Sequence, residues 1–347
     1  MLSAIIDKLY LYFIAGAPLL ASSFGWFLLT ATCVLLIETV SVGWDRGSLR
    51  RLLVVHSRSA RTDLALFLLI GTGVGIAAQG ALSLGIVFFF GMWVKQTFNF
   101  SIMAQWGPYL HLAIFLVVID LINYWQHRLM HSVPFLWEIH KFHHSASEFN
   151  MITVWRDHPI ERAMNQAIVA IPIASLGFPG HAALVTIFLT AYGMLKHGSL
   201  RWQWGWFGRY ILQSPMDHWI HHSPLPEHFN RNFANNLSIF DHCFGTYYNG
   251  KVANAYIGIV GDDLNDHGFL RNIFICQWRS CLELLRGLRI LPCAEFQRPH
   301  RRISVHARAS LMSWLCGQRD LEPNKGKFIQ EERSKACIEP ERTPQKP

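Results

Sequence analysis

Histidines gather in three short clusters, and imidazole is a common ligand of divalent iron, zinc and copper. The first cluster places two histidines four residues apart, and each of the others places one histidine three residues before an adjacent pair. On a helix, residues three and four apart share a face, so each cluster can aim its imidazoles at a common point. The members are His127, His131, His140, His143, His144, His218, His221 and His222.

Random placement does not account for these spacings. The chain holds 18 histidines among 347 residues. One HxxxH is then expected roughly once per chain, whereas one HxxHH is expected roughly 0.05 times and two of them roughly 0.001 times. The histidines of the clusters are too many for one ion, so two metals are the simplest interpretation.

Carboxylates near the clusters are candidates for supporting roles. Asp120 falls within the same narrow helical arc as His127, and an acidic residue near the end of a membrane span needs a partner. It could accept a hydrogen bond from a ligand imidazole and fix its tautomer, or instead bond Asn123 or a water. A site made almost entirely of imidazole carries little negative charge, so its redox chemistry would depend on carboxylates such as Asp120, Asp217 and Asp241.

Long apolar segments predict an all-α protein, a polytopic membrane helical bundle with a cytosolic, histidine-rich helical cap that holds a di-metal site. Only 16% of the residues are charged, against about 25% in soluble proteins. Turn residues at 177–180 divide the last apolar segment into a helical hairpin. The expected membrane segments are residues 19–40, 62–94, 109–125 and 163–196.

The charge pattern orients this bundle. The loop 44–61 carries five arginines, and basic loops favour the cytoplasmic side. The histidine clusters also have basic neighbours, which places them on the same face. Formal net charge is +8, but no basic stripe interleaved with aromatics lies outside these loops, so nucleic acid is not an expected partner. The seven cysteines contain no CxxC, which indicates reduced thiols.

The three clusters, HRLMH, HKFHH and HWIHH in this order, resemble the fatty acid hydroxylase and sterol desaturase superfamily. The resemblance covers about residues 120–248. It implies a membrane-embedded four-helix core, a cytosolic di-metal site and oxygen-dependent oxidation of a lipid. Carried over by motif, the eight clustered histidines are metal ligands, and His197 stands where the family tends to offer one more. The alternative for His197 is an interaction with the carbonyls at a helix end.

Two further histidines have less defined places in this pattern. His158 lies in the stretch Arg156-Asp-His-Pro-Ile-Glu161, either as a ligand or behind the ligands, with Arg156 and Glu161 bracing the fold. His242 lies where the family often has a tryptophan–aspartate–arginine run, so it receives no role, although Asp241 can still brace the site.

The resemblance predicts an enzyme, an oxidoreductase with two non-haem irons that uses O2 to hydroxylate or desaturate a lipid, with hydroxylation favoured. A sterol, a fatty acyl chain and an ether lipid all remain open as substrates. The chain shows neither a GxGxxG after a strand nor an HPGG haem segment, so electrons are expected from a separate reductase, ferredoxin or cytochrome. The protein is expected in a membrane, with the site on the cytoplasmic face. A bacterial cytoplasmic membrane is favoured over the endoplasmic reticulum.

Two other classes of function fit less well. A zinc-dependent membrane hydrolase usually has three ligands and a nearby glutamate base, whereas this chain has more histidines and no HExxH. A non-enzymatic metal carrier would spread histidines along a path across the bilayer. The expected organisation is membrane spans and a basic loop at 1–108, a catalytic domain at 109–250, a cytoplasmic segment at 251–317 and a disordered tail at 318–347.

Overall fold

A computed structural model describes residues 28–71, 107–176, 182–250, 256–262 and 264–288, together with residues 25, 93, 96, 97 and 290. Within these ranges the chain is helical and forms no strand, and the one isolated β-bridge joins Leu212 to Leu237. The expected all-α class is therefore confirmed for the described part of the chain. The predicted disordered tail at 318–347 lies outside it.

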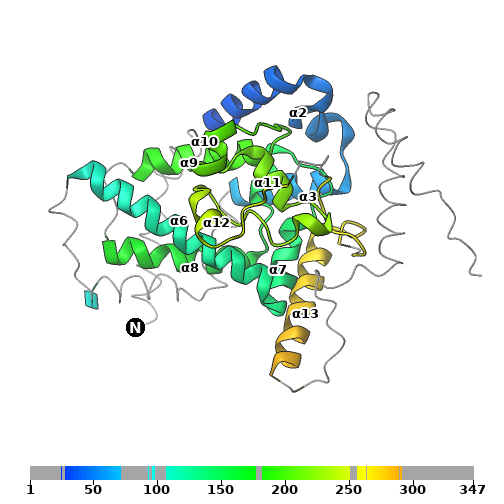
Figure 1. The fold of residues 1–347 in the computed structure, drawn as a ribbon. Coiled ribbons are helices and arrows are strands. Elements are labelled where there is room, and N and C mark those ends of the chain that lie inside the picture. Colours follow the sequence, from blue (N-terminus) through cyan, green and yellow to red (C-terminus); the bar gives the residue numbers. More distant parts are fainter. Residues whose placement is uncertain are drawn as a thin grey trace, which may run out of the picture. The chain divides into compact units, whose positions relative to one another are not determined.

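The helices follow the chain in the order shown in Figure 1. The first half contains a helix over Leu28–Val42, then η1 (Trp44–Arg46), α2 (Ser48–Arg50), η2 (Arg51–Val55), α3 (Arg58–Gly71), α6 (Pro108–Ser132), α7 (Pro134–His144) and η4 (Met151–Trp155). The second half contains α8 (Pro159–Leu176), α9 (Ala182–His197), α10 (Gly205–Tyr210), α11 (Pro215–His221), η5 (Pro226–His228), α12 (Ile239–Cys243) and α13 (Phe269–Gly287).

The helix α6 is the one helix in the described ranges that is long and apolar enough to cross a membrane. It continues beyond the expected span at 109–125 and carries the first histidine cluster in its last turns. The helix over Leu28–Val42 is apolar but shorter, and most of the expected span at 62–94 lies outside the described residues. Several crossings therefore stay a prediction.

The predicted hairpin at 163–196 corresponds to α8 and α9, whose connecting turn lies outside the described residues. The helix α8 packs against α6, as Figure 1 shows, and α9 ends at His197. The arginine-rich loop at 44–61 folds into the short helical turns η1, α2 and η2 and the start of α3.

Local sequence signals set the start of the two short helices that carry HxxHH. Pro134 begins α7 and Pro215 begins α11, in the position where proline's missing N–H costs no helical hydrogen bond. In α11 the Ser214 side chain accepts from the Asp217 amide while the Asp217 carboxylate accepts from Ser214, which forms a capping box. The register of the histidines on α11 follows from this fixed start.

The longest helix of the C-terminal part, α13, lies against α7 (Figure 1). Their contact includes a small core of Phe142, Leu264 and Cys276, all of which are fully buried. The helix that carries the second histidine cluster is thus held on one side by α6 and on the other by α13.

Candidate metal centre

The fold brings together all nine histidines that were predicted as ligands, in two groups. In each group the candidate donor nitrogens lie within 4.8 Å of one another. The five-histidine group comprises His127, His131, His140, His144 and His221. The four-histidine group comprises His143, His197, His218 and His222.

Each HxxHH cluster divides between the two groups, so the expectation that one cluster aims at one point is wrong. On α7, His140 and His144 belong to the five-histidine group and His143 to the other. Residues four apart differ by only about 40° around a helix, whereas adjacent residues differ by about 100°. The third cluster divides in the opposite sense, since His221 alone joins the five-histidine group. The same spacing on two helices thereby builds both groups.

Hydrogen bonds on the outer ring nitrogens orient several of these imidazoles. His127 Nδ1 lies 2.9 Å from the Phe233 carbonyl, and His221 Nδ1 lies 2.9 Å from the Arg231 carbonyl. His197 Nδ1 likewise lies 2.9 Å from the Gly193 carbonyl. A carbonyl only accepts, so Nδ1 carries the proton and Nε2 presents a lone pair toward the group. This is the arrangement that orients metal-bound histidines in proteins.

The inward nitrogens face one another at distances that suit a shared ion. His131 Nε2 lies 3.1 Å from His144 Nε2, and His197 Nε2 lies 2.9 Å from His218 Nε2 and 3.4 Å from His143 Nε2. Two nitrogens bound at about 2.1 Å with an angle of about 90–110° would be about 3.0–3.4 Å apart. Within the same groups, the Nε2 atoms of His140, His221 and His222 are buried without a hydrogen-bond partner. Divalent metals would complete these unsatisfied donor sets.

Burial keeps the imidazoles in the form that binds metal. Loss of solvation lowers the pKa of His143 and of His221 to about 3. The same cause moves the pKa of His144, His218 and His222 well below the usual range. Neutral imidazole is the ligand form, so these side chains require no deprotonation at neutral pH before they can coordinate a metal.

A loop between α11 and α12 supplies two of the orienting carbonyls, and we call residues 231–237 the carbonyl loop. The Asp241 carboxylate accepts hydrogen bonds from the amides of Phe233 and Ala234, at 2.8 and 3.0 Å. Asn232 has a left-handed backbone, with φ of 56°, which asparagine tolerates better than most residues. The loop thus presents its carbonyls toward the histidines because its amides are held from the other side.

Asp120 binds this loop and not an imidazole. One of its carboxylate oxygens accepts from the backbone and side-chain nitrogens of Asn236, and the other accepts from the Leu237 amide at 2.7 Å. Because both oxygens are occupied by the loop, the structure shows neither of the two expected protein partners, a ligand imidazole or Asn123. Asp217 likewise caps α11, so its contacts support the third cluster through the helix start.

His158 and His242 lie outside both groups. His158 Nδ1 accepts from the Ile160 amide, and its Nε2 lies 3.2 Å from the Ile273 carbonyl. His242 Nε2 lies 2.8 Å from the Arg209 carbonyl, away from the other histidines. Of the two roles considered for His158, its contacts favour a place behind the ligands.

Glu161 has a more direct role than the bracing that its sequence context indicated. Its Oε1 lies 2.7 Å from His140 Nδ1, and both side chains are buried. A carboxylate behind a ligand imidazole holds the ring and raises its basicity. Glu161 lies 21 positions after His140, so only the packing of α8 near α7 reveals the pair.

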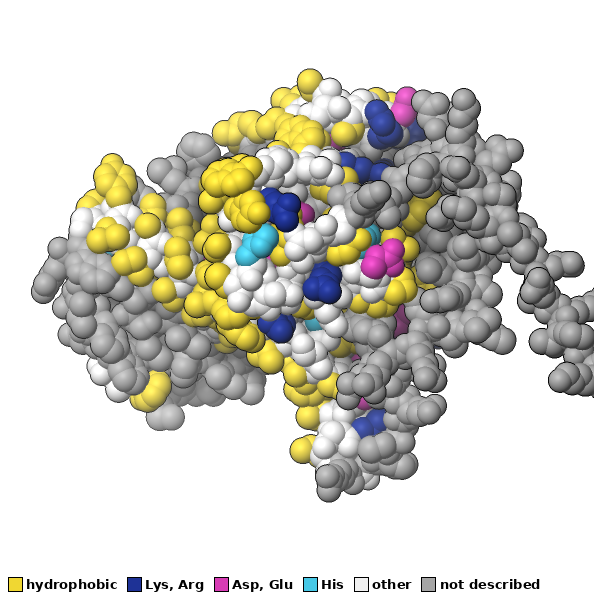
Figure 2. Space-filling view, viewed as in Figure 1, with side chains coloured by type: hydrophobic (Ala, Val, Ile, Leu, Met, Phe, Trp, Pro, Cys, Tyr) yellow, Lys and Arg dark blue, Asp and Glu magenta, His cyan; other side chains and the backbone are white. Residues whose placement is uncertain are grey.

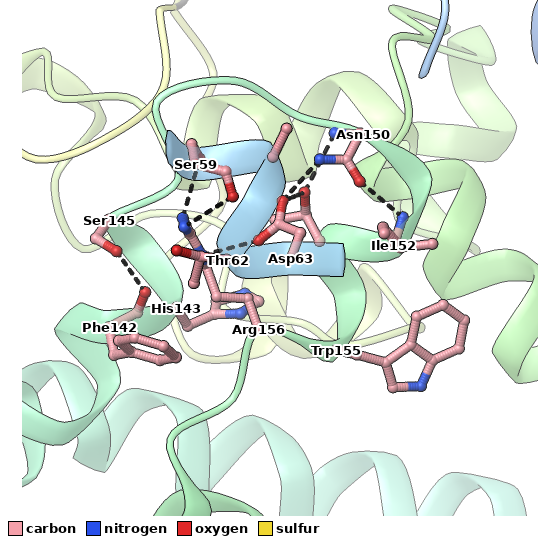
Figure 3. A network of polar contacts seen from close by, with 12 residues as sticks. Ser59, Thr62, Asp63, Phe142, His143, Ser145, Asn150, Ile152, Trp155 and Arg156 are labelled. Atoms are coloured by element: carbon pink, nitrogen blue, oxygen red, sulfur yellow. Dashed lines mark hydrogen bonds and ion pairs between the residues drawn. The ribbon is translucent and has the colours of Figure 1, made fainter. Parts of the chain in front are cut away.

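A buried ion pair supports the segment that follows α7 (Figure 3). Arg156 Nε lies 2.9 Å from Asp63 Oδ1, and both side chains are fully buried. The other Asp63 oxygen accepts from Asn150 and Thr153, each at 2.7 Å. Figure 3 places His143 beside Arg156. The network therefore ties α3 to the chain next to the second histidine cluster.

Comparisons with known proteins agree with the histidine motifs. Residues 112–246 match the fatty acid hydroxylase family. The chain is 32% identical to an ornithine lipid hydroxylase of Rhizobium tropici over 159 residues, which are 45% of this chain and 48% of that protein. It is 31% identical to an alkylglycerol monooxygenase of Xenopus tropicalis and 30% identical to that of Homo sapiens, over 40% and 44% of this chain and 30% and 33% of those proteins.

The chain spans less than half the length of these relatives, and no solved structure matches it. The matched residues include the three histidine clusters and His197. The histidine motifs, the two histidine groups and these similarities together identify residues 112–246 as a fatty acid hydroxylase domain, similar to lipid hydroxylases of the fatty acid hydroxylase and sterol desaturase superfamily.

Proposed function

We propose that this protein is a membrane di-iron oxygenase that hydroxylates a lipid with O2 and external electrons. The observation that carries the proposal is the pair of buried histidine groups whose Nε2 atoms face one another. The five- and four-histidine groups would each hold one iron. Two irons so held would supply the activation of O2 and the oxidation of a strong C–H bond, which protein side chains alone do not perform.

The protein's own part in this reaction is to hold the histidine ligands and orient their rings. Backbone carbonyls at Arg231 and Phe233 fix the rings of His221 and His127, and Glu161 fixes the ring of His140. Eight of the nine histidines are buried, which would restrict the access of water to the site and limit side reactions during oxidation. No side chain is needed as a general base.

The membrane location and the electron supply belong to the same proposal. The apolar helix α6 ends in the first histidine cluster, which would place the metals at the membrane surface. The arginines of the 44–61 loop favour the cytoplasmic face for the site. As the membrane itself we propose a bacterial cytoplasmic membrane in preference to the endoplasmic reticulum. A separate reductase, ferredoxin or cytochrome would deliver electrons there. The family match at 112–246 supports a catalytic domain at 109–250.

The relatives guide the choice of substrate. They are named for ornithine lipids and alkylglycerols, and we propose lipids of these two kinds as first candidates, ahead of sterols. The names of both relatives describe insertion of oxygen, which favours hydroxylation over desaturation.

The test is metal analysis of detergent-purified protein with one variant for each group, His221→Ala and His143→Ala. We expect about two irons per chain in the natural protein, in keeping with one ion per group, and reduced iron in each variant. His242→Ala, outside both groups, is the matched control and should keep its iron. Lipid extracts of expressing cells should then contain O2-dependent hydroxylated lipid that both ligand variants lack.

Unchanged metal content in both ligand variants, or one zinc with no O2-dependent product, would contradict the proposal. If the protein is isolated with two zinc ions, the zinc is replaced by ferrous iron and lipid oxidation is measured again. Iron bound without any lipid oxidation would also contradict the proposed function.

A further inference from the structure

The helix α13 packs Ile273 and Ile275 against the core, yet it also exposes large apolar side chains on its outer face. Its buried positions, Asn272, Cys276 and Ser280, are polar or small. Its exposed positions are large and apolar, with Leu270 59%, Phe274 71% and Trp278 65% exposed. A helix on a water-facing surface buries its apolar stripe. The outer face of α13 therefore requires a non-aqueous contact.

These apolar side chains form a continuous stripe. Leu270, Phe274 and Trp278 recur every four residues and so share one face of the helix. Cys281 and Leu284, both exposed, continue the same face toward the end of the helix. We call these five residues the outer stripe of α13. Its length, over four turns, distinguishes it from scattered surface hydrophobics.

The place of α13 in the fold indicates what covers the outer stripe. On α6, the candidate membrane span, exposed apolar side chains continue as far as Leu129. The helix α7 begins two residues after α6 ends, and α13 packs against α7. In Figure 2, hydrophobic side chains along α13 lie on the side toward which α6 and α8 extend. The outer stripe therefore lies near the level where the candidate span leaves the membrane.

Charge supports the same contact. The helix carries three arginines, of which Arg279 bonds Asp262 and Arg286 bonds Glu283, so Arg271 is the one that can face a lipid headgroup. Arg271 is exposed beside the outer stripe. Basic residues flanking an apolar face, with tryptophan among the apolar side chains, are typical of helices that lie in the headgroup region of anionic membranes.

We infer that α13 is an in-plane membrane helix, which inserts its outer stripe into the headgroup and upper acyl region of the bilayer. This inference rests on the proposed membrane location of the protein. Because the opposite face of α13 packs on α7, the bilayer surface would then support the helix that carries His140, His143 and His144.

The test measures the depth of α13 in the full chain, reconstituted in nanodiscs of phosphatidylcholine with a minority of phosphatidylglycerol. A nitroxide label is attached at Phe274→Cys in a background whose exposed native cysteines are serine. Glu227→Cys is the control, because Glu227 is exposed and charged in another part of the molecule. We expect the ratio of collisions with O2 to collisions with a water-soluble nickel chelate to be several-fold higher at position 274 than at 227. A second label at Leu270→Cys should match position 274.

Two results would overturn the inference. Equal access of the nickel chelate to positions 274 and 227 would place the outer stripe in water. Low access of both reagents at 274 would mean that protein covers it, and dipolar broadening between labels would identify a second copy of this chain. The readout does not depend on iron or on lipid oxidation, so failure of the proposed function would leave it interpretable.

Discussion

Replacing Glu161 by alanine tests whether the carboxylate behind His140 maintains metal affinity. The bond from His140 Nδ1 to Glu161 Oε1 is 2.7 Å long, and each side chain is 5% exposed. Without this acceptor, a buried imidazole N–H loses its partner, at a cost of about 1–3 kcal/mol. Loss of such a partner of a metal ligand lowers affinity about 10–100-fold, which corresponds to about 1.4–2.7 kcal/mol. The two estimates agree.

The assay is competition between the protein and a ferrous chelator at neutral pH. We expect the Glu161→Ala protein to lose affinity by about one to two powers of ten at the iron of the five-histidine group, with a smaller loss at the other iron. Glu161→Gln retains an amide oxygen that can accept from His140 Nδ1, so its loss should be smaller. Glu138→Ala is the matched control, because Glu138 is a buried carboxylate on α7 itself that bonds Lys141 and no histidine.

Equal losses of iron in Glu161→Ala and Glu138→Ala would refute this reasoning, because they would reflect general damage around α7. Full iron affinity in Glu161→Ala would refute it as well, since the imidazole would then be held by packing alone.

Three further predictions concern the elements around the histidines. Asp120→Ala removes one of the two carboxylates that hold the carbonyl loop, so both thermal stability and iron content should fall, and Asp120→Asn should recover part of each in the same two measurements. Arg156→Met leaves Asp63 buried without its cation, and unfolding in detergent should show a loss of about 3–5 kcal/mol, which a second Asp63→Leu change should reduce. In the metal-free protein, burial lowers the pKa of His143 and His221 to about 3. In the unfolded chain the same side chains have the ordinary histidine pKa of about 6.5. The free energy of unfolding should therefore keep its full value above pH 6.5 and fall as the pH drops toward 3, by up to about 2.7 kcal/mol per pH unit for the two groups together. Thermal melts at decreasing pH measure this loss.

The eight clustered histidines could be predicted from sequence because the information is local, whereas His197 was predicted from the family resemblance. HxxxH and HxxHH spacings act within one or two helical turns, and prolines mark the starts of α7 and α11. The division of each HxxHH between two groups was missed, although it follows from the rotation of about 100° between adjacent residues. What the spacing alone lacks is the direction from which the second helix approaches, and that is set by tertiary packing.

The support of the site could not be predicted, because it depends on backbone groups and on distant pairs. The carbonyls of Arg231 and Phe233 that orient His221 and His127 carry no side-chain signature. Asp120 and the carbonyl loop lie 116 positions apart, so the sequence offered a nearby imidazole as partner where the fold supplies a loop.

The division of the clusters has a mechanical consequence. Because α7 and α11 each give histidines to both groups, a rotation of either helix displaces ligands of both groups together. Two metals in such a site would be coupled through the helices, even without a ligand shared between them. On α7, the start at Pro134, the hydrogen bond of Glu161 to His140 and the contact with α13 all oppose that rotation. Loss of one of these restraints should therefore weaken binding at both metals, with the larger effect in the group that the restraint contacts.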